Sequence, residues 1–148
     1  MRVKARLQGD RELARAFEKA GINAEEAITE IVQEATLSLQ GLVIRSVQRG
    51  PAMGRTYVKY TPNRTHTASA PGQPPMTDTG DLANSIKWQM RGMDGYVFSR
   101  LDSPPYPLYL EFGTKNMQAR PFFRPAVERE RPKFVKRYDR LIDKVVKA

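Results

Sequence analysis

The chain has 148 residues, of which 40% are hydrophobic, and this size and composition predict one folded domain over residues 1–148 and argue against general disorder. Its 25 basic and 16 acidic residues leave a formal net charge of +9, which favours polyanionic or acidic partners but also occurs in basic soluble domains without one. The absence of cysteine excludes disulfides and thiolate metal sites, and no apolar run approaches the roughly 20 residues that a membrane-spanning helix needs.

The first third of the chain predicts a short strand followed by two helices. Apolar and basic residues alternate over 3–7, which predicts a strand with one buried face, and Asp10 is expected to begin a short helix that Gly21 ends. Asn23 and Glu26 have the spacing of a capping box. The long helix after them carries an apolar stripe up to Gly50-Pro51, formed by Ile28, Ile31, Val32, Ala35, Leu39, Leu42, Val43 and Val47.

Residues 51–79 differ in composition from what precedes them. Prolines, glycines, threonines and basic residues dominate, and only 57–60 has the composition of a strand. Segments of this length without regular structure are usually functional or disordered. We interpret 51–79 as an extended loop or arm that becomes ordered on assembly; a disordered loop without a role is the alternative.

A short helix and a hairpin are predicted next. Thr79 is expected to cap a helix that carries Leu82 and Ile86. Residues 87–91 and 96–100 have the pattern of two strands joined by a four-residue turn with a glycine at each end.

Two more helices are predicted towards the C-terminus. Pro107 favours the first turn of a short helix that Gly113 ends. The last helix is expected to begin near Pro125 and to kink or restart at Pro132, since proline removes a helical donor and crowds the preceding turn. Its apolar stripe is Phe134, Val135, Tyr138, Leu141, Ile142, Val145 and Val146. The fold class predicted is α+β: a small, mainly antiparallel sheet packed against the long N-terminal helix and the C-terminal helix, with a long Pro/Gly-rich loop.

Residues suited to catalysis are sparse. The single histidine, His66, falls in the predicted loop without neighbouring carboxylates, where a surface role is more common than a catalytic one. Asp78 and Asp81 form a close acidic pair at a predicted helix start, and stabilisation by the helix dipole explains them simply. No phosphate-binding loop, metal-ligand spacing or nucleophile elbow occurs. We therefore predict a protein that is not an enzyme and uses no metal or cofactor.

The most informative segment combines a helix end with two adjacent phenylalanines. Glu111 falls at the C-terminal end of a short predicted helix, where the dipole disfavours an anion, so we expect a partner such as Arg120, Arg124 or a lysine of a neighbouring subunit. An exposed, unpaired carboxylate is the alternative. Phe122 and Phe123 direct their rings to opposite faces of an extended backbone, which leaves one ring for a partner; burial of both in the core is the alternative.

Four motifs follow one another in the second half of the chain. They are Ser69-Ala70-Pro71-Gly72-Gln73-Pro74-Pro75, Thr79-Gly80-Asp81-Leu82 with Ser85-Ile86, Glu111-Phe112-Gly113-Thr114, and Arg120-Pro121-Phe122-Phe123-Arg124-Pro125-Ala126. In this order and spacing they resemble the tail-component or tail-completion proteins of lambda-like long-tailed bacteriophages, which are encoded among the head–tail joining genes. The resemblance covers about Val43 to Ala126, and the flanking helices in type only.

The resemblance implies a virion structural protein, made in the host bacterial cytoplasm, at the head–tail junction or the head-proximal tail end. Such a protein completes the tail and joins it to the DNA-filled head through a ring, expected to be a hexamer. The implied partners are further copies of the chain, a tail terminator or tail-tube protein, connector or stopper proteins of the neck, and the DNA backbone in the lumen, with no membrane. A head-side stopper or a tail terminator is the nearer alternative. A sequence-independent basic nucleic-acid-binding protein is the alternative from another class.

Two sets of candidate site residues result. Candidates for contact with other subunits or partners are Tyr57, Tyr60, Glu111, Phe112, Thr114, Arg120, Phe122, Phe123 and Arg124. The last helix has eight basic and four acidic residues between Glu128 and Lys147, which describes either a surface lining a DNA passage or an ordinary solvated face. The DNA-facing candidates are Arg55, Lys59, Arg64, Lys136, Arg137 and Arg140.

Overall fold

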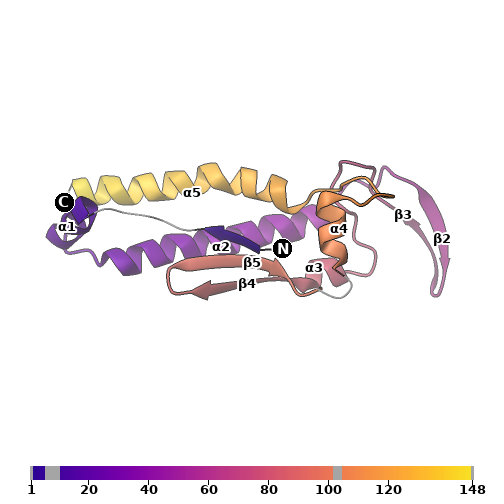
Figure 1. Cartoon of the computed structure of the whole chain (residues 1–148), viewed down its shortest axis with the longest axis horizontal. Helices are drawn as coiled ribbons and strands as arrows, with labels where there is room; N and C mark the ends of the chain where they lie inside the picture. Colours follow the sequence, from indigo (N-terminus) through magenta and orange to yellow (C-terminus); the bar gives the residue numbers. More distant parts are fainter. Residues whose placement is uncertain (1, 6–10, 102–104, 148) are drawn as a thin grey trace.

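The protein is an elongated α+β structure in which one long helix lies between a second long helix and a sheet (Figure 1). The computed structural model describes residues 2–5, 11–101 and 105–147. The elements are β1 (Arg2–Ala5), α1 (Arg11–Lys19), α2 (Ala24–Gln48), β2 (Thr56–Tyr60), β3 (Asn63–Thr67), α3 (Asp81–Ser85), β4 (Ile86–Arg91), β5 (Asp94–Ser99), α4 (Tyr106–Phe112) and α5 (Phe123–Val146). The predicted fold class is confirmed.

Helix α2 is the central layer. Helix α5 runs antiparallel along one side of it, and β4 and β5 pack on the other side (Figure 1). The predicted cap is present at its start, where the Asn23 Oδ1 accepts the backbone N–H of Glu25 at 3.1 Å and of Glu26 at 3.3 Å. Gly21, with φ of 65°, lies just after α1 as predicted, while the predicted cap Asp10 lies outside the described residues.

The three-stranded sheet is antiparallel, in the order β1-β5-β4. The predicted hairpin of β4 and β5 is present, but its turn contains only Gly92 and Met93. The four-residue turn was wrong because cross-strand pairing continues to its end, where Arg91 pairs with Asp94. The strand predicted at the N-terminus is present as β1, which pairs with β5.

The main core lies where α2, α3, the sheet and the start of α5 meet. Its buried members are Leu39, Val43, Val47, Leu82, Ala83, Ile86, Val97, Phe122, Phe123 and Ala126. The phenylalanine rings are fully buried and lie 5.0 Å apart between centroids. The reading in which one of these rings faces a partner is therefore wrong, because α5 begins at Phe123 and the backbone there is not an extended strand.

Three predicted helix details differ in the structure. Gly80, not Thr79, is the N-cap of α3, and Ile86 already belongs to β4. Helix α5 begins two residues before Pro125, which is tolerated because a proline in the first turn removes no helical hydrogen bond. It continues unbroken through Pro132, so the predicted restart is absent; packing along α2 outweighs one lost backbone bond.

The segment predicted as an extended loop contains a hairpin. Strands β2 and β3 pair from Thr56 with Thr67 to Tyr60 with Asn63, around a turn with a cis peptide bond between Thr61 and Pro62. This hairpin, here called the arm (residues 56–67), projects beyond the end of the helical layers (Figure 1). The sequence prediction missed β3 because that strand contains no apolar residue.

A close crossing of β5 over α2 yields the first prediction. A Cβ atom on Gly95 would overlap the Thr36 hydroxyl and lie 3.2 Å from Val32 Cγ1. We expect Gly95→Ala to lower the free energy of unfolding by about 1–3 kcal/mol, because the overpacked strand must move away from the helix. Urea unfolding followed by circular dichroism measures this.

Gly41→Ala in α2 is the matched control. Its added methyl group would meet only the flexible end of Arg45, at 3.2 Å. Alanine in a helix interior is expected to raise stability by about 0.5–1 kcal/mol. Equal effects of the two substitutions would contradict the proposed close crossing at Gly95.

Candidate functional site

A buried carboxylate joins α4 to α5. The Glu111 side chain is 5% exposed and accepts three backbone N–H groups, from Phe122 at 2.8 Å, Phe123 at 2.9 Å and Arg124 at 2.9 Å. These donors belong to the first turn of α5, where a helix has no internal acceptors and its dipole attracts an anion. The partner of Glu111 is therefore the N-terminus of α5, not the arginine or lysine side chain expected from the sequence.

The loop between α4 and α5 holds this arrangement in register. Gly113 ends α4 with φ of 77°, and a Cβ atom there would lie 2.8 Å from the Met117 carbonyl oxygen. The chain then returns, so that the Arg120 N–H donates to the Leu110 carbonyl at 2.6 Å. Glu111, Gly113 and the Arg120-Pro121 pair thus all stabilise one compact turn between α4 and α5.

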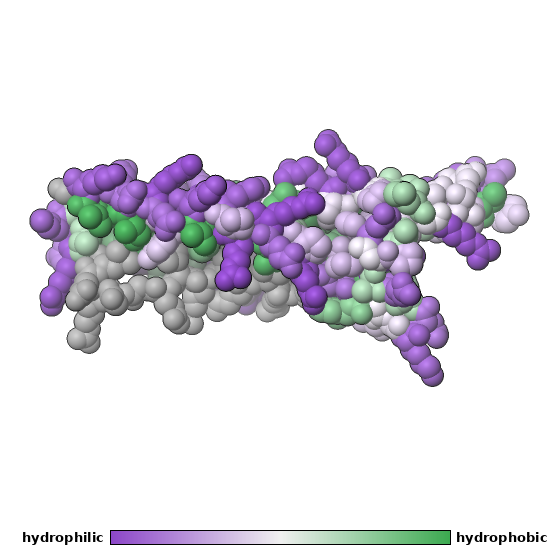
Figure 2. All heavy atoms as spheres, turned by 90° about the horizontal axis from the view of Figure 1, so that it is seen from above, coloured by the Kyte–Doolittle hydropathy of each residue, from purple (hydrophilic) through white to green (hydrophobic). Residues whose placement is uncertain are grey.

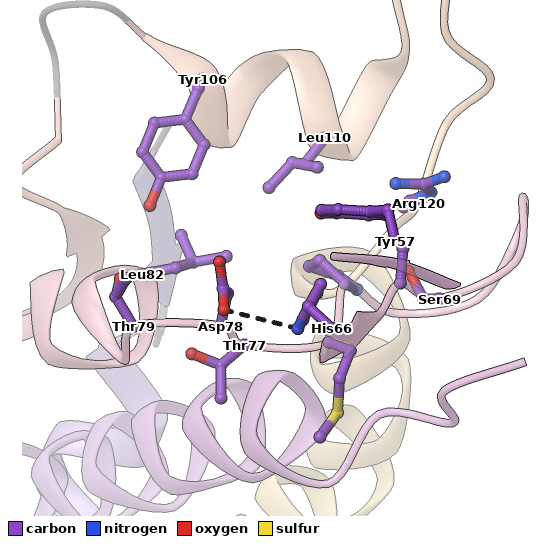
Figure 3. A pocket seen from close by; sticks show the side chains of 13 residues that line it. Tyr57, His66, Ser69, Thr77, Asp78, Thr79, Leu82, Tyr106, Leu110 and Arg120 are labelled. Carbon is purple, nitrogen blue, oxygen red and sulfur yellow. Dashed lines mark ion pairs between the residues drawn. The ribbon is translucent and has the colours of Figure 1, made fainter. Parts of the chain in front are cut away.

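A second carboxylate holds the base of the arm. Asp78 forms ion pairs with Lys59 of β2 and with Arg64 of β3, the latter at 2.7 Å between Nη2 and Oδ1. His66 Nδ1 lies 3.5 Å from the same Oδ1 (Figure 3). Burial, and then the positive charges of Lys59 and Arg64, lower the pKa of His66 below its usual value, so the ring is mainly neutral at pH 7. Asp78 therefore gathers the basic side chains on one face of the arm.

A pocket of about 230 Å³ lies between the base of the arm and α4, and is here called the root pocket (Figure 3). Tyr106 and Leu110 of α4 face Asp78 and His66 across it. Its lining is Tyr57, His66, Ala68, Ser69, Pro75, Met76, Thr77, Asp78, Thr79, Leu82, Tyr106, Leu110 and Arg120. Three buried polar atoms of this lining, Ser69 Oγ, Arg120 Nε and Asp78 Oδ1, have no hydrogen-bond partner among the described residues, and of these Asp78 Oδ1 is ion-paired with Arg64.

The arm and α4 both expose large apolar side chains. On the arm, Tyr60 is 85% exposed and Val58 51% exposed, and on α4 Phe112 is 60% exposed. Large exposed aromatic side chains are a common feature of protein–protein contact surfaces. The site therefore has the character of a contact surface.

The predicted subunit-contact residues divide into three groups. Tyr60, Phe112, Thr114 and Arg124 are exposed. Tyr57 and Arg120 line the root pocket. Glu111, Phe122 and Phe123 are buried within the chain, which corrects their assignment as contact residues: burial of both rings and of the carboxylate stabilises the start of α5 instead.

The predicted DNA-facing residues also divide. Lys59 and Arg64 pair with Asp78, and Arg137 pairs with Glu130 and, at 3.4 Å, with Glu34. The remaining candidates are exposed: Arg55, Lys136 and Arg140. Half of the predicted set thus has intrachain partners that sequence spacing did not indicate.

Sequence reasoning missed the role of Asp78. Asp78 was read as a helix-start residue, because nothing in the sequence indicates that the basic residues at 59 and 64 lie on one face of a hairpin. The alternation of Arg64 and His66 with threonines was an available signal for β3.

Among the described residues, no three or more His, Cys, Asp or Glu side chains are grouped so as to hold a metal ion. Within the same part of the chain, no helix has both the length and the apolar character required to cross a membrane. Comparisons with protein-family models, with curated proteins and with solved structures found no match.

The role of Glu111 in capping α5 yields the second prediction. Glu111→Ala leaves buried donors of Phe122 and Phe123 unsatisfied, so we expect a loss of at least about 1–3 kcal/mol in the free energy of unfolding. Glu111→Gln keeps one acceptor oxygen and should lose less. Glu128→Ala, which removes an exposed carboxylate from α5, is the control and should change stability by less than about 0.5 kcal/mol. Equal losses in Glu111→Ala and Glu128→Ala would contradict the capping role.

The Asp78 cluster yields the third prediction. Asp78→Asn removes the carboxylate charge that pairs with both Lys59 and Arg64. We expect the free energy of local opening of the arm to fall by about 1 kcal/mol or more. Amide hydrogen exchange in β2 and β3 should then speed up by roughly fivefold or more, while α2 exchanges as before. Asp139→Asn, at an exposed position of α5, is the control. Unchanged exchange in the arm would show that Asp78 does not hold it.

Proposed function

We propose that this protein is a virion structural protein of a long-tailed bacteriophage, at the head–tail junction or the head-proximal end of the tail. It completes the tail and joins it to the DNA-filled head by assembling into a ring with further copies of itself. The motif resemblance between about Val43 and Ala126 supports the proposal, and one structural observation carries it. That observation is the projecting arm with its exposed apolar face.

The arm has the properties of an assembly element. A two-stranded hairpin is marginally stable by itself, and no other strand of the described part of the chain pairs with β2 or β3. Within the described ranges, their outer edges therefore offer unpaired backbone groups to another chain. Val58 and Tyr60 point to the same face of β2 because they are two residues apart, and both are exposed. A second protein surface on this face would bury apolar side chains and rigidify the hairpin.

The motif residues fix the parts of the chain that lie next to the base of the arm. Glu111 fixes the start of α5, and Gly113 lets the chain return to α4 beside the root pocket. Close to the arm, the Gly54 N–H donates to the Ala68 carbonyl at 2.8 Å, and a Cβ atom on Gly54 would lie 2.7 Å from the Ser69 carbonyl carbon. These contacts hold a surface in a defined place, as a ring subunit requires.

The outer face of α5 supports an additional contact with DNA. Hydrophilic side chains are frequent on this face, with apolar side chains between them (Figure 2), and Lys136 and Arg140 are exposed on α5. Basic residues on a ring attract the phosphate backbone independently of sequence and in a salt-sensitive way. The same feature favours the alternative function, a basic nucleic-acid-binding protein that acts without a virion.

Silencing the gene during phage infection tests the proposed function, with negative-stain electron microscopy of the lysate. We expect DNA-filled heads beside separate tails, and restoration of joined particles by a plasmid copy of the wild-type gene. Tails of abnormal length would assign the protein to tail termination instead. Joined, infectious virions without the protein would overturn the proposal, and steeply salt-dependent DNA binding by the free protein would then support the alternative.

A further inference from the structure

The root pocket is incomplete within one chain. Ser69 is 1% exposed, yet its hydroxyl has no partner among the described residues, and the buried Nε of Arg120 has none either. An unsatisfied buried polar group costs about 1–3 kcal/mol, so a group that fills the pocket and meets these atoms would be stabilised. Leu82, Leu110 and other apolar side chains form the remaining wall. The pocket therefore suits a side chain with an apolar body and a polar end.

The size of the pocket limits the group further. Its volume of about 230 Å³ corresponds to roughly eight waters at about 30 Å³ each, which is comparable with one phenol ring and its hydroxyl. A guanidinium group from Arg120 lies in the lining, and a cation attracts the face of an aromatic ring. Tyrosine meets each of these requirements.

The arm presents such a tyrosine to solvent. Tyr60 is the last residue of β2, beside the turn at the tip of the arm, and is 85% exposed. It cannot reach the pocket of its own chain for two reasons. The pocket lies at the base of the arm, where Tyr57 and His66 form part of its wall. Tyr60 is three residues from Tyr57, so the two side chains leave opposite faces of the strand.

We propose that Tyr60 of one copy inserts into the root pocket of a second copy. Its ring lies against Leu110 and the Arg120 guanidinium, and its hydroxyl bonds to the Ser69 hydroxyl. This inference specifies the subunit contact of the ring proposed above and rests on that function only for its biological setting.

The geometry of this contact dictates the type of assembly. The inserted residue and the pocket are different parts of the surface, so each copy both donates a tyrosine and accepts one. Such heterologous contacts produce a closed ring when the rotation between copies divides a full turn, and an open filament otherwise. A symmetric dimer is not the product of a single contact of this kind.

Two complementary variants test the contact. Tyr60→Ala lacks the inserting ring but keeps the pocket, whereas Ala68→Phe fills the pocket but keeps Tyr60. We expect the wild-type chain to form oligomers in light-scattering and native mass-spectrometry measurements, and each variant alone to be monomeric, with association weakened at least tenfold. An equimolar mixture should form a dimer of one copy of each variant and nothing larger, because only one contact remains possible.

Met93→Ala is the matched control, since it removes an exposed apolar side chain in the turn between β4 and β5. It should assemble as the wild type does. A wild-type chain that stays monomeric at the highest attainable concentration, unchanged assembly of Tyr60→Ala, or a mixture without the mixed dimer would each overturn the inference.

Cross-linking gives an independent test if Ala68→Phe does not fold. The chain contains no cysteine, so engineered cysteines have no competing thiol. The cysteines must leave Tyr60 in place, so one replaces Asn63, which pairs with Tyr60 across the arm, and the other replaces the exposed lining residue Thr79. The double variant Asn63→Cys and Thr79→Cys should form a ladder of disulfide-linked oligomers under mild oxidation, and Met93→Cys with Thr79→Cys should not. Equal ladders, or none in the first pair, would overturn the contact. The silencing experiment is independent of both results, so the proposed function and this contact can fail separately.

Discussion

The position of α5 depends on the Glu111 carboxylate. It accepts N–H groups from the first turn of that helix, and those donors lie beside the fully buried rings of Phe122 and Phe123. Buried amides without acceptors are costly, so the rings can enter the core at this place only if a side-chain acceptor, here the Glu111 carboxylate, accompanies them. One side chain from α4 therefore allows α5 to begin inside the core and to run back along α2.

The central helix α2 joins α5 to the three-stranded sheet, and together these layers form an elongated body. It contacts α5 on one side and the sheet on the other, so its buried residues serve both layers. The buried carboxylate of Glu130 helps to join the helices: the Ser38 hydroxyl donates to it at 2.6 Å, and Arg137 pairs with it. Because that arginine is held internally, the charge available on the outer face of α5 is smaller than the sequence suggests.

The arm differs from this body in how it is stabilised. Its strands pack chiefly on each other, and the ion pairs to Asp78 attach one face of it, while Tyr60 and Val58 face outward. A rigid body with an arm held at one end is suited to contacts between subunits, since the body fixes where the arm begins. The root pocket lies beside that attachment and Tyr60 lies at the tip of the arm, so the two halves of the proposed assembly contact are at opposite ends of the arm.

Local patterns in the sequence were sufficient for much of the fold. The 3.6-residue stripe and the Asn23 cap predicted α2, and the position of Pro107 before Gly113 predicted α4, because these features act through neighbouring residues. Pairing between distant residues was decided by the tertiary structure. Glu111 meets amides eleven to thirteen positions away, and Asp78 meets basic residues of a strand without any apolar side chain. Periodicity and propensity contain no information on such partners, because folding alone brings them together.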